Sequence, residues 1–278
     1  MKRTLWVASA ALMTAVSAPA MAQSTVDWSG PYVGGFVGYA HPSDDGDETL
    51  LFDRDLDGSY DDTVTTGTGA NAFGPGFCDG AAEGNSAPDG CSDDEGAAIG
   101  GVRAGYDWQM GGSWVVGVVG EIAFTDIDDS VTGFSVTPAA YVFNRNLEHV
   151  AALRARVGYA AGSGLYYVTG GVARGKIENA FATTNTANDF AATTDDDEAD
   201  GYQLGAGVEY ALGGGWTVTG EYLFTSLDAG DYNIRVSQGA APATNPFILP
   251  PNTTGTDMIR SGSDFDVHAL RLGMNYRF

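Results

Sequence analysis

Apolar residues recur at every second position over most of this chain. In 270–278 (LRLGMNYRF), for example, Leu, Met, Tyr and Phe alternate with Arg, Gly and Asn. A period of two places successive side chains on opposite faces of a strand. The pattern therefore predicts eight strands, each with one apolar face and one small or polar face, over 32–40, 96–109, 114–125, 147–160, 165–177, 201–211, 216–224 and 270–278.

The connections between these strands alternate in length. Short Gly-rich turns are expected at 111–113, 161–164 and 213–215, and long polar loops near 42–96, 127–146, 179–200 and 229–263. Up-and-down hairpins that close into a barrel produce this alternation, whereas a soluble β-sandwich does not require it. A polar interior and an apolar exterior mark a membrane barrel, so we expect an all-β, eight-stranded antiparallel up-and-down transmembrane β-barrel. Residues 131–143 should form a hairpin that projects beyond the bilayer.

Aromatic residues gather at the strand ends next to the short turns. Amphipathic rings prefer the headgroup level of a membrane, so this placement predicts one interfacial girdle. Its expected members are Trp28, Trp108, Trp114, Trp216, Tyr159, Tyr166, Tyr210, Tyr276 and Phe278.

The N-terminal segment predicts export, and the charge of the chain limits its partners. Residues 1–22 have the pattern of a secretory signal peptide: Lys2 and Arg3, then an apolar run, then small residues up to position 22. Residues 23–278 would then form the barrel. The formal net charge of −23 and pI near 4.1 exclude a nucleic-acid partner, because phosphate would be repelled.

Several short phrases occur in a familiar order: 28–35 (WSGPYVGG), 153–159 (LRARVGY), 166–173 (YYVTGGVA), 205–210 (GAGVEY) and 273–278 (GMNYRF). With them the chain resembles the outer-membrane β-barrel proteins of Gram-negative bacteria ("porin family", outer-membrane immunogenic protein-like), relatives of the OmpA membrane domain. The resemblance implies an integral outer-membrane protein with both termini in the periplasm, surrounded by lipid and lipopolysaccharide. It also implies that Phe278 is a signal to the barrel assembly machinery.

The inward faces carry four residues of each charge sign. These are Arg103, Arg154, Arg156 and Arg271, with Asp107, Glu121, Glu209 and Glu221. Inside a narrow barrel they should pair, because an unpaired buried charge costs several kcal/mol. We expect a closed, charged lumen and a structural or surface role. The alternatives are a narrow porin-like channel for ions or small solutes, and a surface adhesion or recognition protein whose ligand the sequence does not identify.

The first long loop, 42–96, holds fifteen acidic residues and one Arg. Within it Asp53, Asp55 and Asp57 alternate before a Gly, a spacing that can wrap carboxylate oxygens around Ca²⁺, with Asp61 as a fourth candidate ligand. Val64 stands where an EF-hand offers a bidentate Glu. The hypothesis of a calcium loop therefore competes with that of a solvated acidic loop, and we expect no obligatory cofactor.

The two cysteines, Cys78 and Cys91, should form a disulfide in an exported protein.

We expect no enzymatic activity. The spacing of Gly170, Gly175 and Lys176 fits a phosphate-binding loop, but Ile177 replaces the required Ser or Thr and the stretch reads as a strand. His268 beside Asp266 is a weak candidate for hydrolytic chemistry.

Two basic residues near the outer end of one strand, Arg174 and Lys176, should either reach lipid headgroups by snorkelling or contact lipopolysaccharide phosphates.

Overall fold

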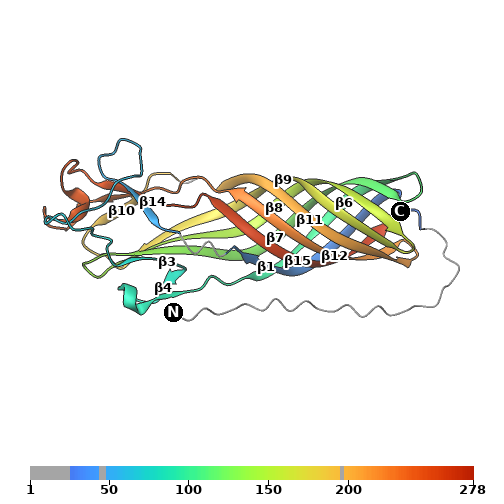
Figure 1. The fold of residues 1–278 in the computed structure, drawn as a ribbon, viewed down its shortest axis with the longest axis horizontal. Helices are drawn as coiled ribbons and strands as arrows, with labels where there is room; N and C mark the ends of the chain where they lie inside the picture. Colours follow the sequence, from blue (N-terminus) through green and yellow to red (C-terminus); the bar gives the residue numbers. More distant parts are fainter. Residues whose placement is uncertain (1–25, 44–47, 195–196) are drawn as a thin grey trace.

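The computed structural model describes residues 26–43, 48–194 and 197–278. Eight antiparallel strands form a closed ring in which each strand pairs with the next and β15 pairs with β1 (Figure 1). The strands are β1 (Gly30–Pro42), β6 (Ala97–Met110), β7 (Trp114–Phe134), β8 (Ala140–Ala161), β9 (Gly164–Thr183), β11 (Glu198–Gly213), β12 (Trp216–Asp228) and β15 (Asp264–Arg277). The predicted fold class is confirmed. No helix among the described residues is long and apolar enough to cross a membrane. The predicted signal peptide lies outside the described residues.

Side-chain alternation along each strand sorts the barrel wall into two faces. Leu270 and Leu272 are 69% and 68% exposed, whereas Arg271 between them is 3% exposed. The outward apolar residues form an exposed belt, with members on every strand of the ring, as expected for a wall that faces lipid. Members of this belt include Val37, Val102, Leu153, Val168, Val172, Leu204, Leu270 and Leu272.

One end of the barrel, which we call the turn end, carries the three short turns and the C-terminus (Figure 1). In the β11–β12 turn Gly213, Gly214 and Gly215 all have positive φ, a backbone conformation that other residues adopt only with strain. Eight of the nine predicted girdle aromatics lie on the outer wall at this end. Trp28 is the exception and is described with the lumen below.

The opposite end, the loop end, is more ordered than the sequence predicts. Strands β7, β8 and β9 continue past the ring, and the hairpin predicted over 131–143 is present, with Val131 paired to Phe143. The remaining elements there are β2 (Leu50–Asp53), β3 (Gly76–Asp79), β4 (Ala81–Ala82), η1 (Ala87–Asp89), β5 (Cys91–Ser92), β10 (Asp189–Ala192), β13 (Ile234–Ser237), η2 (Pro246–Ile248) and β14 (Thr256–Arg260).

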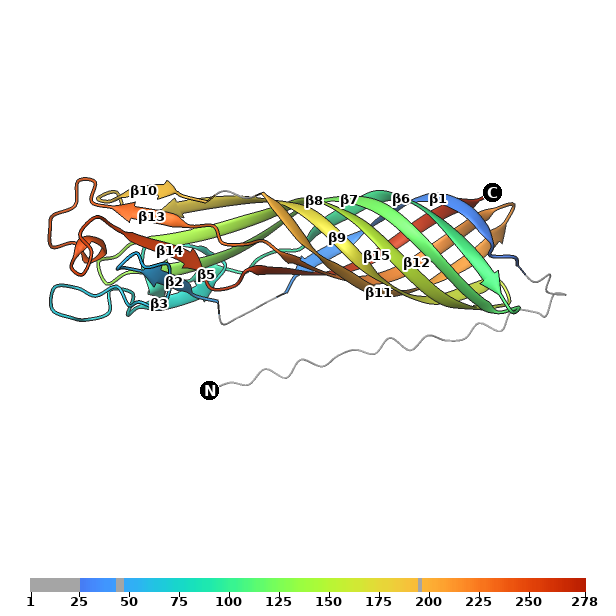
Figure 2. The same cartoon turned by 90° about the horizontal axis from the view of Figure 1, so that it is seen from above.

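These elements form a small domain of their own, which we call the loop-end domain (48–96, 128–146, 178–194 and 230–263). Strands β10, β13, β14 and β2 make a four-stranded sheet that lies beside the extended β7–β8–β9 strands, and β3 pairs with β7 (Figure 2). A buried apolar core fills this domain. Its residues include Leu50, Phe52, Phe73, Val131, Tyr141, Phe143, Ile234, Val236, Phe247 and Met258.

The long connections were expected to be polar loops, but three of them contribute strands and buried apolar residues to this core. Core residues such as Phe52 and Met258 lie in strands of only four or five residues. Such short strands give too few alternations for a period of two to be recognised. They gain stability by packing across the sheets, a long-range contact that no local pattern encodes.

The inward face also differs from the prediction. In the half of the barrel next to the loop end the lumen is filled mainly by apolar side chains, large ones together with alanines, rather than by polar ones. This apolar layer includes Phe36, Ile127, Leu147, Ile177, Leu223, Leu227, Phe265 and Val267. An eight-stranded barrel is only wide enough for its own side chains, and an apolar filling carries no cost of burying charge.

Candidate functional site: the barrel lumen and the acidic clusters

At the turn end of the lumen four charged side chains from β6, β8, β11 and β15 meet. Arg156 contacts Asp107, and its Nη1 lies 2.9 Å from Glu209 Oε2. Arg277 contacts the same two carboxylates, with Nη2 2.5 Å from Asp107 Oδ2 and Nε 3.2 Å from Glu209 Oε1. Both carboxylates are completely buried. We call this group the lower ionic layer.

Aromatic rings close this layer on the turn-end side. Trp28 is fully buried, and its ring centroid lies 4.9 Å from the guanidinium carbon of Arg277. Its backbone N–H donates to Gln109 Oε1 at 2.8 Å, and its carbonyl oxygen accepts from Arg277 Nη1 at 2.7 Å. The assignment of Trp28 to the lipid girdle was therefore wrong. Trp28 precedes β1, so the alternation of side chains along the strand does not predict where its ring points. In the structure the ring lies in the lumen.

A second set of charges, the upper ionic layer, lies midway along the lumen. Glu121 accepts from Arg154 Nη2 at 2.5 Å and from Arg271 Nη1 at 2.7 Å. Glu221 contacts Arg271, lies 3.4 Å from Arg154 Nη1 and 4.0 Å from Arg103 Nη1. All five side chains are buried. The eight predicted lumen residues are thus divided between two layers.

The set of lumen charges chosen from the sequence omitted Arg277. Its signal was present, because Arg277 follows Arg271 and Asn275 at every second position on the inward face of β15. With it, five Arg face four carboxylates in the lumen, a formal excess of 5 − 4 = +1. Neutral groups complete the layers: Tyr167 donates to Glu221 at 2.7 Å and Thr217 to Glu209 at 2.6 Å.

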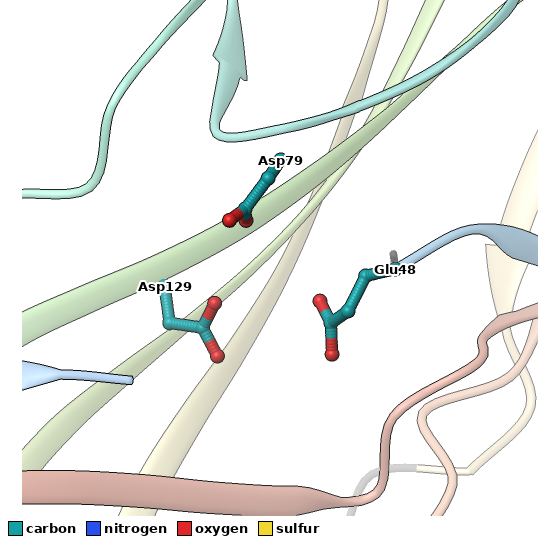
Figure 3. A group of neighbouring side chains, drawn as sticks. All are labelled: Glu48, Asp79 and Asp129. Carbon is teal, nitrogen blue, oxygen red and sulfur yellow. The ribbon is translucent and has the colours of Figure 1, made fainter. Parts of the chain in front are cut away.

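A third charged group lies where the barrel meets the loop-end domain, and the sequence did not predict it. Carboxylate oxygens of Glu48, Asp79 and Asp129 lie within 4.8 Å of one another (Figure 3). Arg260 contacts Glu48 and lies 3.1 Å from Asp129, while Arg145 lies 2.7 Å from Asp129. The three carboxylates come from segments that are far apart in the chain, so the spacing of residues in the sequence does not predict this group.

In this group, which we call the junction cluster, the pKa values of the carboxyl groups shift in opposite directions. Burial raises the pKa of Glu48, although Arg260 and Arg145 oppose this effect. Burial would also raise the pKa of Asp129, but the same two guanidinium groups hold it below its usual range. Next to them, burial raises the pKa of Asp94 to about 6, even though the Ser130 N–H donates to its carboxylate at 2.9 Å.

The structure brings together three of the four candidate calcium ligands. Carboxylate oxygens of Asp53, Asp55 and Asp57 lie within 4.8 Å of one another at the end of β2. Asp53 is buried and accepts the backbone N–H groups of Leu56 at 2.6 Å and Gly58 at 2.8 Å. Asp61 does not belong to this group and is exposed.

The predicted disulfide between Cys78 and Cys91 is confirmed. It joins β3 to β5 and so ties the β4–β5 hairpin to the edge of the loop-end domain.

The two basic residues on the outer wall are already paired. Arg174 lies 2.6 Å from Glu198, and Lys176 lies 2.8 Å from Glu148 and 2.9 Å from Glu178. The ring of His268 hydrogen-bonds to the Tyr222 hydroxyl at 2.7 Å rather than to Asp266.

Comparisons with known proteins show which family the chain belongs to. The 31 kDa outer-membrane immunogenic proteins of Brucella melitensis and Brucella suis are each 32% identical to the chain over 273 residues, covering 94% of the chain and 89% of each relative. The solved structure of OprG from Pseudomonas aeruginosa is 13% identical, with a TM-score of 0.48, and covers 90% of this chain and 97% of that one. The family described as "Outer membrane protein beta-barrel domain" matches residues 8–278, and the chain belongs to this family of outer-membrane β-barrel proteins.

Proposed function

We propose that this outer-membrane protein is a closed barrel that anchors a folded domain at the cell surface. In this proposal the turn end and both termini face the periplasm and the loop-end domain faces outward. The observation that carries the proposal is the sequence of layers in the lumen: Trp28, the lower ionic layer, the upper ionic layer and the apolar layer.

Each layer opposes the passage of ions for a different physical reason. In the two ionic layers every carboxylate contacts at least two guanidinium groups, so an entering ion would have to break pairs that are buried from water. In the apolar layer an ion would lose its hydration shell without a replacement. The lumen therefore supports a structural role rather than transport.

Conductance in a planar lipid bilayer tests this proposal. We expect no steady single-channel steps from the refolded full-length mature protein at 1 M KCl. Heat-modifiable gel migration of the same sample would verify that the barrel is folded. Large, steady steps from such a sample would overturn the closed lumen.

The competing transport function has one observation in its favour. The formal excess of one Arg in the lumen would make any conducting path prefer anions. Small, steady, anion-selective steps in the same bilayer would therefore support a narrow channel.

The loop-end domain gives the third candidate function, surface adhesion or recognition. It has its own core and disulfide, so it can present a fixed surface. We propose no enzymatic role for this domain or for His268, because His268 pairs with a tyrosine rather than with a carboxylate that could orient it for catalysis.

We also propose that Asp53, Asp55 and Asp57 bind Ca²⁺. Three carboxylates whose oxygens approach within 4.8 Å offer the hard oxygen ligands that this ion prefers. Calorimetric titration of the protein with CaCl₂ tests the idea. We expect binding heat for the wild type and for Asp61→Asn, and a strong loss for Asp55→Asn. Equal heats for all three proteins, or none for the wild type, would contradict it.

Two further roles follow from the membrane location. We propose that Phe278, which is exposed at the end of β15, is read by the barrel assembly machinery, and that Phe278→Ala lowers the yield of folded protein in the outer membrane. For Arg174 and Lys176 we propose contact with headgroups or lipopolysaccharide phosphates at the outer rim, in competition with their present carboxylate partners. A lipid-binding assay on Arg174→Gln, Lys176→Gln protein would then show weaker lipopolysaccharide retention.

A further inference from the structure

A cavity opens in the loop-end domain. This domain lies at the end of the molecule opposite the C-terminus (Figure 2). Four segments that are far apart in the chain surround the cavity: 72–73, the β7–β8 turn at 135–141, the turn after β9 at 184–187, and 245–247 at η2. Its volume is about 260 Å³. This is just below the range of about 300–1,000 Å³ that drug-sized ligands occupy, so the cavity suits a single ring rather than a long chain.

Aromatic rings fix the base of this cavity. The ring centroids of Phe73 and Tyr141 are 5.1 Å apart, and both lie within 6.0 Å of the Phe247 ring. All three residues are buried and belong to the core of the loop-end domain. The base is therefore held rigid by packing and does not have to be ordered when a ligand enters, which lowers the cost of binding.

Hydroxyl and amide groups form the rim. The hydroxyls of Thr137 and Thr186 make no hydrogen bond to any described residue, and one N–H of the Asn245 side chain donates to Asn188 Oδ1 at 3.0 Å, which leaves the second N–H available. By contrast Asn185 uses its amide to hold Tyr141 and Asn188. The rim thus contains both supporting groups and groups free to meet a ligand.

No charged residue lines the cavity among the residues that the structure describes. This is unusual in a chain with 36 acidic residues and a formal net charge of −23. A charged ligand would find no counter-ion here and would lose hydration. A purely apolar ligand would bury the rim hydroxyls without hydrogen-bond partners, which is unfavourable.

We propose that this cavity binds one uncharged sugar ring. A pyranose combines an apolar C–H face, which matches the apolar and aromatic base, with a periphery of hydroxyls, which matches the Thr and Asn rim. The inference deepens the recognition function proposed above, but binding to purified protein does not depend on which end faces outward or on whether the lumen conducts.

Saturation-transfer NMR on the folded protein in lipid nanodiscs tests the proposal, with glucose, galactose and N-acetylglucosamine as neutral probes. We expect a transfer signal for at least one of them, with millimolar affinity, and at least a tenfold weaker affinity for glucuronate and for glucosamine. In Thr137→Trp the new side chain should fill the cavity and abolish the signal. Thr254→Trp, at an exposed residue outside the cavity lining, is the matched control and should bind as the wild type does.

Thr137→Val removes only the free hydroxyl and keeps the shape of the side chain. It should weaken binding severalfold without affecting the fold, and so serves if the Trp variant does not fold. The proposal is overturned if none of the neutral sugars gives a signal, if Thr137→Trp folds and still binds, or if the charged sugars bind as well as the neutral ones.

Discussion

The guanidinium carbon of Arg277 lies 4.9 Å from the centre of the Trp28 ring, and Arg277 donates a hydrogen bond to the Trp28 carbonyl oxygen at 2.7 Å. This contact joins the segment before the first strand to the end of the last strand, across the seam where β1 pairs with β15. It covers the turn-end side of the lower ionic layer.

Replacement of Trp28 tests how much this contact contributes. We expect Trp28→Ala to lower the free energy of unfolding by about 3–5 kcal/mol, because a large buried ring is lost and the carboxylates beneath it become accessible to water. Urea unfolding in lipid vesicles, followed by the loss of heat-modifiable migration, measures the change. Trp114→Ala, at an exposed position on the outer wall, is the control and should cost distinctly less. Equal losses for both variants would contradict the assignment of Trp28 to the lumen.

A second prediction concerns the upper ionic layer. Glu221 lies among Arg271, Arg154 and Arg103, so Glu221→Gln leaves buried guanidinium groups without their counter-charge. The expected loss is about 3–5 kcal/mol in the same unfolding experiment. Glu178→Gln removes an exposed partner of Lys176 and should cost less than about 1 kcal/mol. If the two variants were equally stable, the layer would not hold the barrel together.

A third prediction concerns the loop-end domain, which should unfold in a variant of its core while the barrel stays folded. Phe143 is buried between the rings of Phe181 and Tyr232, at centroid distances of 5.0 and 6.1 Å. Phe143→Ala should destabilise this domain by about 3–5 kcal/mol and expose it to trypsin, while heat-modifiable migration persists. Val136→Ala, on the exposed turn of the same hairpin, should leave protease resistance unchanged. Loss of the heat-modifiable band in Phe143→Ala would show that the two parts unfold together.

The folded structure around Asp94 should become more stable at acidic pH. Burial raises the pKa of this carboxyl to about 6 in the folded protein, against about 3.9 when unfolded, so the folded state binds its proton more tightly. Stability therefore increases as pH falls from about 6 toward 4, and is lost again as pH rises through 6. Because the side chain is partly exposed, the effect should stay below about 1 kcal/mol.

Hydrogen exchange of the Ser130 amide, which donates to Asp94, measures this effect. The ratio of protection in the wild type to that in Asp94→Asn should rise as pH falls from 6 to 4, because the Asn variant cannot take up the proton. This comparison cancels the intrinsic pH dependence of exchange and the titration of Glu48 and Asp129 nearby. A ratio that is constant or falls would contradict the assigned shift.

Local alternation predicted the barrel wall well. Arg271 points inward and Leu272 outward because a strand sends successive side chains to opposite faces, and this rule needs no knowledge of the rest of the chain. The hairpin expected over 131–143 is also present. Trp108 and Trp216 lie exposed next to the short turns, on the outer wall where the alternation places them.

Features that depend on contacts between distant segments were not predictable in the same way. Glu48, Asp79 and Asp129 meet only because three connections fold against each other, and Phe52 is a core residue only because β2 pairs with β14. Trp28 lies just before the first strand, so the alternation of strand side chains does not predict which way its ring points. The calcium hypothesis relied on spacing, which correctly grouped Asp53, Asp55 and Asp57 but also included Asp61, which lies apart from them.

The most direct test of the closed lumen is the chemical accessibility of its interior. The described residues contain no free cysteine, so a single Thr219→Cys can be placed beside Arg103 in the upper ionic layer, with Val218→Cys on the lipid face and Thr254→Cys in an exposed turn as controls. We expect a charged, membrane-impermeant thiol reagent to modify Thr254→Cys rapidly and to leave the other two unmodified in folded protein, whichever side it is added to. Rapid modification of Thr219→Cys in the folded barrel would show a water-filled passage and contradict the account.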